Sequence, residues 1–134
     1  MANEAVLVQD LEDRKLEVTV ADGATIEKGT ILKLSDPNTG AASSADGDIF
    51  LGIALAEKVA NDGQTRLAVS RHAVWDIKDS GAGITAGEFV KIAGANLIAT
   101  ADDDQVEKSG EVVGMALQTA AAAEVIEVLV GGWG

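Results

Sequence analysis

The sequence predicts a mainly β protein: a small β-barrel or β-sandwich-like module of two duplicated β units, with short helical turns and an extended N-terminal arm. Three observations support this fold class. Apolar and polar residues alternate with a period of two in several segments. Turns rich in glycine separate these segments. Two short blocks of sequence also recur in the same order in both halves of the chain.

The first predicted strand shows the alternation most clearly. Leu16, Val18 and Val20 alternate with Glu17 and Thr19, the pattern of a strand with one buried face. A second strand, Ile31 to Leu34, follows a turn that ends at Gly29. The first of these strands belongs to the N-terminal arm, and the second opens the first β unit.

Turn residues divide the rest of the first half. The segment Asp36 to Gly40 contains Pro, Asn and Gly and predicts a tight turn, and Ala41 to Asp48 predicts an exposed loop. Phe50 to Leu55 is an apolar strand, and Gly52 inside it indicates a bulge or a close backbone approach. After a turn at Asn61 to Gly63, Arg66 to Val74 is expected to form one strand.

The second half repeats this plan. Ile26 to Leu34 matches Ile84 to Ile92, 58 residues later, and Leu51 to Leu55 matches Val113 to Leu117, 62 residues later. Each unit is expected to bury its apolar face against the other. Arg66 to Val69 also matches Val125 to Val130. The repeat units are expected at about 24–77 and 82–130, within a compact domain over 21–134. An arm with the first strand is expected over 1–20.

Helix is expected only as short turns. Ala54 to Ala60 and Gln118 to Glu124 can each form a turn or two between strands. The alanines at 120 to 123 favour helix, but the segment is too short to be stable alone.

Composition excludes several function classes. The 134 residues suit one domain, whose core must be aliphatic because the chain has two Phe, two Trp and no Tyr. A net charge of −12 without a basic cluster argues against nucleic-acid and membrane-surface partners. The absence of cysteine removes disulfides and thiolate chemistry. The start Met1 to Glu4 lacks the basic region of a signal peptide, so export is not expected.

No residue pattern predicts catalysis, a metal or a cofactor. Ser70, His72 and Asp76 are expected in a row along one strand, where they cannot converge into a triad. The acidic run at Asp102 to Asp104 does not fit a calcium loop, since Glu107 is at its sixth position and Val113 at its twelfth.

Two other groups of residues each have a competing interpretation. Asp36, Asn38, Asp46 and Asp48 could gather around a cation across their loop, but a solvated acidic loop has the same composition. The turn Gly81 to Gly83 lacks the remainder of a phosphate-binding loop and is interpreted as the linker between the repeats.

The two tryptophans are candidate subunit contacts. Trp75 is expected at the end of the third strand of the first unit, in the core or against another subunit. Trp133 lies among glycines near the last residue and would be costly to leave in solvent, so it is expected to pack in a groove of its own or a neighbouring chain.

With this order of elements, the sequence resembles the capsid decoration (cement) proteins of tailed bacteriophage heads. The features that carry the resemblance are Val8-Gln9-Asp10 with the strand Leu16 to Val20, Ile26 to Ile31, Phe50 to Ala54, Gly63 with Leu67 to Val74, Ile84 to Val90, Val112 to Leu117 and Val125 to Val130. Each motif is degenerate alone, and their order and spacing make the match.

The resemblance implies a structural virion protein without catalytic residues. Such a protein binds the outer surface of the head as a homotrimer, bridges major capsid protein subunits and resists the pressure of packaged DNA. It implies an arm, Asn3 to Val20, that reaches the shell by strand addition. The candidate capsid-binding residues are Val6, Val8, Leu11, Leu16, Val18 and Val20.

A biotinyl- or lipoyl-like carrier barrel is the alternative, because Lys33 lies in a glycine-preceded β region. Those domains present their lysine at a tight turn, whereas Lys33 is expected in the middle of a strand between leucines.

Overall fold

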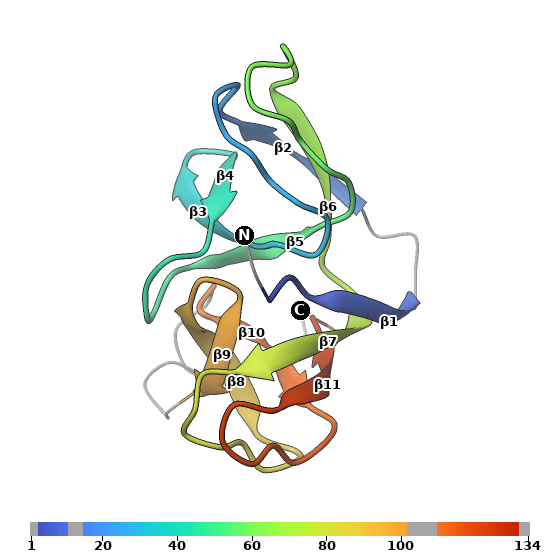
Figure 1. Ribbon diagram of the computed structural model, residues 1–134, viewed down its shortest axis with the longest axis vertical. Coiled ribbons are helices and arrows are strands. Elements are labelled where there is room, and N and C mark those ends of the chain that lie inside the picture. The colour runs from blue at the N-terminus through green and yellow to red at the C-terminus, as the bar shows by residue number, and fades with distance from the viewer. Residues whose placement is uncertain (1–2, 11–14, 102–109, 132–134) are drawn as a thin grey trace.

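The computed structural model describes residues 3–10, 15–101 and 110–131, which form eleven β-strands and no helix. None of these residues therefore lies in a helix that could cross a membrane. The strands build two small barrels that lie one above the other along the long axis of the molecule (Figure 1). This confirms a small β-barrel module made of duplicated units.

The first barrel contains five strands and is closed in the order β2-β4-β3-β5-β6. All neighbours in it are antiparallel except β2 and β4, which pair in parallel through Thr19 and Val20. Its strands are β2 (Lys15–Val20), β3 (Ile31–Asp36), β4 (Thr39–Ala42), β5 (Phe50–Ala54) and β6 (Arg66–Ser70).

The second barrel has the strand order β7-β11-β10-β8-β9, and a parallel pairing of β7 with β9 closes it. One further strand, β1 (Val6–Asp10), pairs antiparallel with the first half of β7. The strands of the barrel are β7 (Ala73–Asp79), β8 (Phe89–Gly94), β9 (Leu97–Thr100), β10 (Val112–Ala116) and β11 (Val125–Val130).

The two barrels share strand pairing residue by residue. Leu32 lies opposite Gly52 in the first barrel, and Val90 lies opposite Gly114 in the second, at the offsets of 58 and 62 that the sequence repeat shows. The parallel pairs β2–β4 and β7–β9 are also equivalent. The repeat is therefore one topology used twice.

The two expected helical turns are not present. Both segments instead run as turns around single antiparallel bridges, Ile26 with Lys58 and Ile84 with Ala120. The bridge residues are related by the same two offsets, 58 and 62. Helix propensity is overridden here because each segment must return to the end of its barrel within a few residues.

The prediction of one strand from Arg66 to Val74 is also wrong. It is divided into β6, which ends at Ser70 and completes the first barrel, and β7, which begins at Ala73 and opens the second. The glycine turn at 81–83 follows β7, so it lies inside the second barrel rather than between the repeats. A loop was expected to begin at Ala41, but Ala41 and Ala42 still belong to β4.

Glycine in the fourth strand of each repeat permits close packing of two backbones. A Cβ at Gly52 would come within 3.1 Å of the Ser70 carbonyl oxygen and 2.9 Å of Val69 Cγ2, and a Cβ at Gly114 would overlap the carbonyl oxygen of Leu129. The register also shifts beside Gly52 and beside Gly114. The bulge and close approach expected at Gly52 are confirmed, and the second barrel repeats them.

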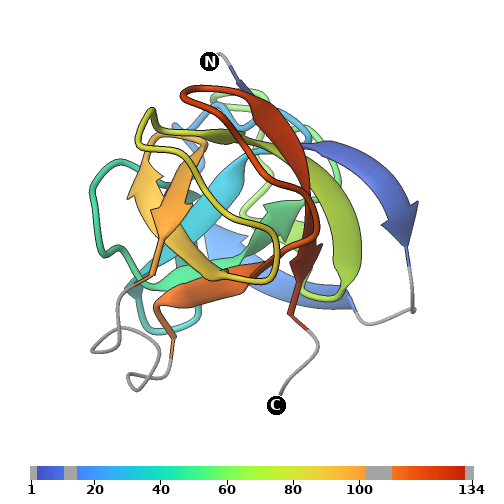
Figure 2. The same ribbon diagram turned by 90° about the horizontal axis from the view of Figure 1, so that it is seen from below.

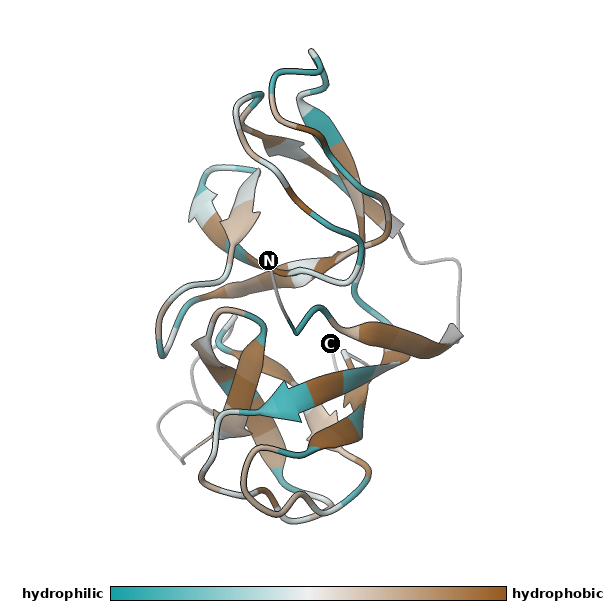
Figure 3. Cartoon of the chain, in the orientation of Figure 1, coloured by the Kyte–Doolittle hydropathy of each residue, from teal (hydrophilic) through white to brown (hydrophobic). Residues whose placement is uncertain are grey.

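The core is continuous between the barrels. Ile31, Phe50 and Ile53 of the first barrel belong to the same buried cluster as Trp75 and the apolar residues of the second. A smaller cluster, which includes Val18, Val20 and Leu67, fills the first barrel. Figure 3 shows apolar colour along strands of both barrels, with polar colour on part of β7 and on some of the connections.

Asn96 joins the two barrels. It occupies the β8–β9 turn with a left-handed backbone (φ 58°) and is fully buried. Its Oδ1 accepts the N–H of Ile31 at 2.9 Å, and its own N–H donates to Ser43 Oγ at 3.1 Å. Ser43 Oγ also donates to the Gly94 carbonyl at 3.0 Å. A hairpin turn of one barrel thus satisfies a buried strand donor of the other.

Asn96→Ala is expected to lower the free energy of unfolding by about 3 kcal/mol, because alanine disfavours the left-handed backbone and leaves the Ile31 N–H buried without an acceptor. The equivalent residue of the first barrel, Asn38 (φ 53°), is exposed in the β3–β4 turn. Asn38→Ala should therefore cost only about 1 kcal/mol, the backbone contribution. Urea unfolding of both variants measures the difference, and equal costs would contradict the assigned role of Asn96.

Candidate functional site

The N-terminal strand β1 lies on the outside of the second barrel, beside β7 (Figure 2). Among the described residues it pairs only with β7, so its other backbone edge is open. Val6 is 60% exposed and Val8 is 45% exposed, while Leu7 between them packs against the core. The strand therefore presents an apolar face and unpaired backbone groups together, the two features that strand addition uses.

Two contacts hold the start of this strand in place. The Ala5 N–H donates to the Gly29 carbonyl at 2.6 Å, and Ala5 is buried. A groove of about 270 Å³ follows the strand and is lined by Ala5, Val6, Leu7, Lys28 and Trp75. The arm is thus an integral part of the sheet at this end of the molecule.

The candidate capsid-binding residues divide into two groups. Val6, Val8 and Leu16, which is 43% exposed, are available for contact. Val18 and Val20 are 2% and 1% exposed and pack in the core of the first barrel, so their side chains stabilise the fold and cannot reach a partner. The alternation correctly predicts the strand β2, but the prediction that Val18 and Val20 contact the shell is wrong because they face the core. Leu11 lies outside the described residues.

The candidate subunit contacts are placed differently. Trp75 lies in β7, has no exposed surface and belongs to the larger buried cluster, which makes it a core residue. Leu7 of β1 lies directly opposite it. Trp133 lies outside the described residues.

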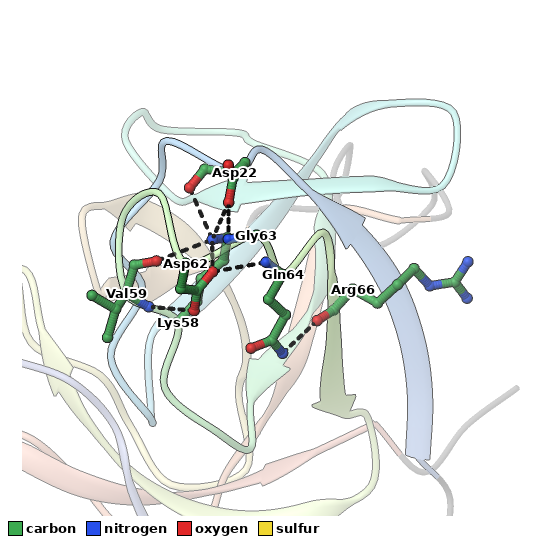
Figure 4. A network of polar contacts seen from close by, with 7 residues as sticks. All are labelled: Asp22, Lys58, Val59, Asp62, Gly63, Gln64 and Arg66. Carbon is green, nitrogen blue, oxygen red and sulfur yellow. Dashed lines mark hydrogen bonds and ion pairs between the residues drawn. The ribbon is translucent and has the colours of Figure 1, made fainter.

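A buried lysine forms the densest polar network of the first barrel (Figure 4). The side chain of Lys58 is 0% exposed, and its Nζ donates to the carbonyls of Asp22 at 2.9 Å and Val59 at 3.2 Å. It also donates to Asp62 Oδ1 at 2.9 Å. The hydrogen bond from Lys58 lowers the pKa of the Asp62 carboxyl, and the N–H donors of Gln64 and Val59 add to this.

This network was not predicted from the sequence. The available signal was the repeat itself, because Lys58 stands where the second barrel has Ala120, at the offset of 62 residues. All donors of Lys58 point to local acceptors, so the network ties two connections of the barrel together and has no free group for chemistry.

Asp46 and Asp48 of the acidic loop both have partners, in the second barrel and within the loop respectively. Burial opposes ionisation of Asp48, but the N–H groups of Ser44 and Ala45, with Lys33 nearby, lower its pKa overall. Asp46 Oδ1 pairs with Lys91 Nζ at 2.7 Å. No group of three metal-ligating side chains occurs in the part of the chain that the structure describes. Asp102 to Asp104 and Glu107 lie outside that part.

The prediction that Ser70, His72 and Asp76 lie along one strand is wrong. Ser70 ends β6 and is buried, His72 lies in the connection, and Asp76 belongs to β7 of the other barrel. The backbone of Asp76 pairs with Val6 on one side and Glu127 on the other.

Lys33 lies in the middle of β3, as expected, and its Nζ donates to Ser44 Oγ at 2.7 Å. A carrier lysine must stand free on a turn to visit another active site. The strand position and the hydrogen bond both oppose that use.

The sequence matches a known protein family over most of its length. The model of the phage cement protein family matches residues 9–132, almost the whole chain. The chain belongs to the phage cement protein family. No functionally curated protein matches its sequence.

A solved structure supports the fold of this cement protein. The N base of the head fiber gp8.5 of bacteriophage phi29 is similar with a TM-score of 0.55 and 15% sequence identity, over 88% of this chain and 93% of that one. At this identity the likeness concerns the fold. The family makes the chain a structural protein of phage heads.

Proposed function

We propose that this cement protein binds the outer surface of the phage head as a homotrimer, contacts the major capsid protein and stabilises the lattice against the pressure of packaged DNA. The family match over residues 9–132 carries this proposal. No catalytic step is part of it.

The open edge of β1 is proposed to make the contact with the shell. Its unpaired backbone groups can extend a sheet of the major capsid protein, and Val6 and Val8 supply apolar side chains on the exposed face. Three arms on one trimer would bind together, so weak single contacts add up through effective concentration. The charge of −12 supports high solubility before assembly.

The double variant Val6→Asp/Val8→Asp is expected to weaken binding to heads by roughly tenfold or more, because two buried apolar contacts become charged. The matched control is Val59→Asp/Val125→Asp, which adds the same charge at valines that are 63% and 59% exposed. Cosedimentation with heads prepared without the protein gives the affinity of each variant. An equal loss in both variants would refute the role of β1.

Point variants test this better than a truncation. Ala5 and Leu7 pack against the core beside Trp75, so removal of the arm would also uncover the second barrel. Light scattering tests the trimer separately, and a monomer at high concentration would contradict it.

A further inference from the structure

The repeat makes β2 and β7 equivalent strands. Leu16 pairs with Val69 of β6, and Trp75 pairs with Val128 of β11, in the same position of each barrel. By the same register Glu17 corresponds to Asp76. On one edge, the last residues of β2 pair in parallel with β4, and the last residues of β7 pair in parallel with β9. The first residues of each strand are not covered by this parallel partner.

In the second barrel this edge is filled. β1 pairs antiparallel with it, with Val6 opposite Asp76 and Leu7 opposite Trp75. Trp75 has no exposed surface, and Ala5 and Leu7 both pack against the cluster to which it belongs.

In the first barrel the equivalent edge is open. Among the described residues, the first part of β2 pairs only with β6. Leu16, the counterpart of buried Trp75, is 43% exposed. The strand ladder gives the direction of the backbone groups. Val20 N–H donates toward β6 (Thr65 O, 2.9 Å) and Thr19 N–H donates away from it (Asn38 O, 2.8 Å). By alternation the N–H of Glu17 also points to the open edge.

We propose that the open edge of β2, Lys15 to Val18, binds an extended segment of the shell protein antiparallel to β2, with an apolar residue over Leu16. The proposal rests on the proposed function. The chain's own β1 shows what such an edge accepts, namely a short strand with an apolar residue, Leu7, opposite Trp75.

The chemistry of the edge favours an uncharged apolar segment of the shell protein. Glu17 Oε1 pairs with Arg66 Nη2 at 3.1 Å, so the two charges beside the exposed Leu16 are balanced. The occupant is therefore a neutral strand, held by backbone hydrogen bonds and by the cover it provides for Leu16.

Glu17→Pro tests the edge directly, because proline removes the outward N–H and leaves the ladder to β6 intact. Glu17→Ala is the control, since it loses the same pairing with Arg66 but keeps the N–H. We expect Glu17→Pro to bind heads about tenfold more weakly, the effect of one lost hydrogen bond, and Glu17→Ala to bind like the wild type.

Hydrogen exchange of the wild-type protein gives a second measurement that needs no variant. The Glu17 amide should exchange quickly in the free protein and slowly on heads. If wild type and Glu17→Pro bind equally and this amide stays unprotected on heads, the proposal is wrong while the proposed function stands. Protection that grows with concentration of the protein alone would assign the edge to a second copy and overturn the proposal. If the wild type does not bind heads, both are wrong.

Discussion

Gly29→Ala is expected to destabilise the protein by about 3 kcal/mol or more and to release the N-terminal strand. Gly29 has a φ of 90°, and a Cβ there would overlap the carbonyl oxygen of Ala5. The substitution therefore combines backbone strain with displacement of the segment that leads into β1. Urea unfolding measures the stability, and exchange of the β1 amides reports the release.

The repeat supplies the control for this variant. Gly87 occupies the same turn of the second barrel with a φ of 94°, and a Cβ there meets no atom within 4 Å. Gly87→Ala should cost only the strain, about 1 kcal/mol. If the two variants unfold at the same urea concentration, the contact of Gly29 with Ala5 does not hold the arm.

Lys58→Met is expected to lower the free energy of unfolding by about 2 kcal/mol, because the partly buried carbonyls of Asp22 and Val59 lose a buried donor. Lys58→Ala should cost about 4 kcal/mol, since it also empties the space of the buried stem. Lys33→Met is the control, and it should cost well under about 1 kcal/mol because Lys33 is 28% exposed.

The same variant has a signature in the pH dependence. The pKa of Asp62 is lowered by its hydrogen bond from Lys58, so its ionised form stabilises the fold above its ordinary pKa of 3.8. That stability is lost as the pH falls below 3.8 through the lowered pKa of the folded state. In Lys58→Met the loss in this acid range should be smaller, and an unchanged pH profile would contradict the assignment.

Much of the fold was predictable because the sequence contains two copies of the same strand and turn pattern. The alternation of β2 and the turn glycines indicated strands locally, and the offsets of 58 and 62 residues aligned the two halves before any pairing was known. The break between β6 and β7 was not predictable, because Arg71 and His72 carry no strong turn signal and the apolar pattern runs across them.

The candidate site was harder to predict for a related reason. Exposure of Val6 and burial of Val18 depend on which strand lies against which, and residues of similar chemistry alternate in both segments. The arm could be recognised as a strand, but its partner, β7, lies more than sixty residues away and only long-range pairing identifies it.

Two repeats in one polypeptide can differ where two identical subunits cannot. In a symmetric dimer of single repeats both barrel edges would be filled, or both would be open, because the subunits are the same molecule. Two repeats in one chain are free of this constraint, and they differ at equivalent positions. Asn96 is buried where Asn38 is exposed, and Lys58 stands where the second barrel has Ala120. The second barrel therefore binds the chain's own β1, whereas the equivalent edge of the first barrel has no partner among the described residues and is open to another molecule.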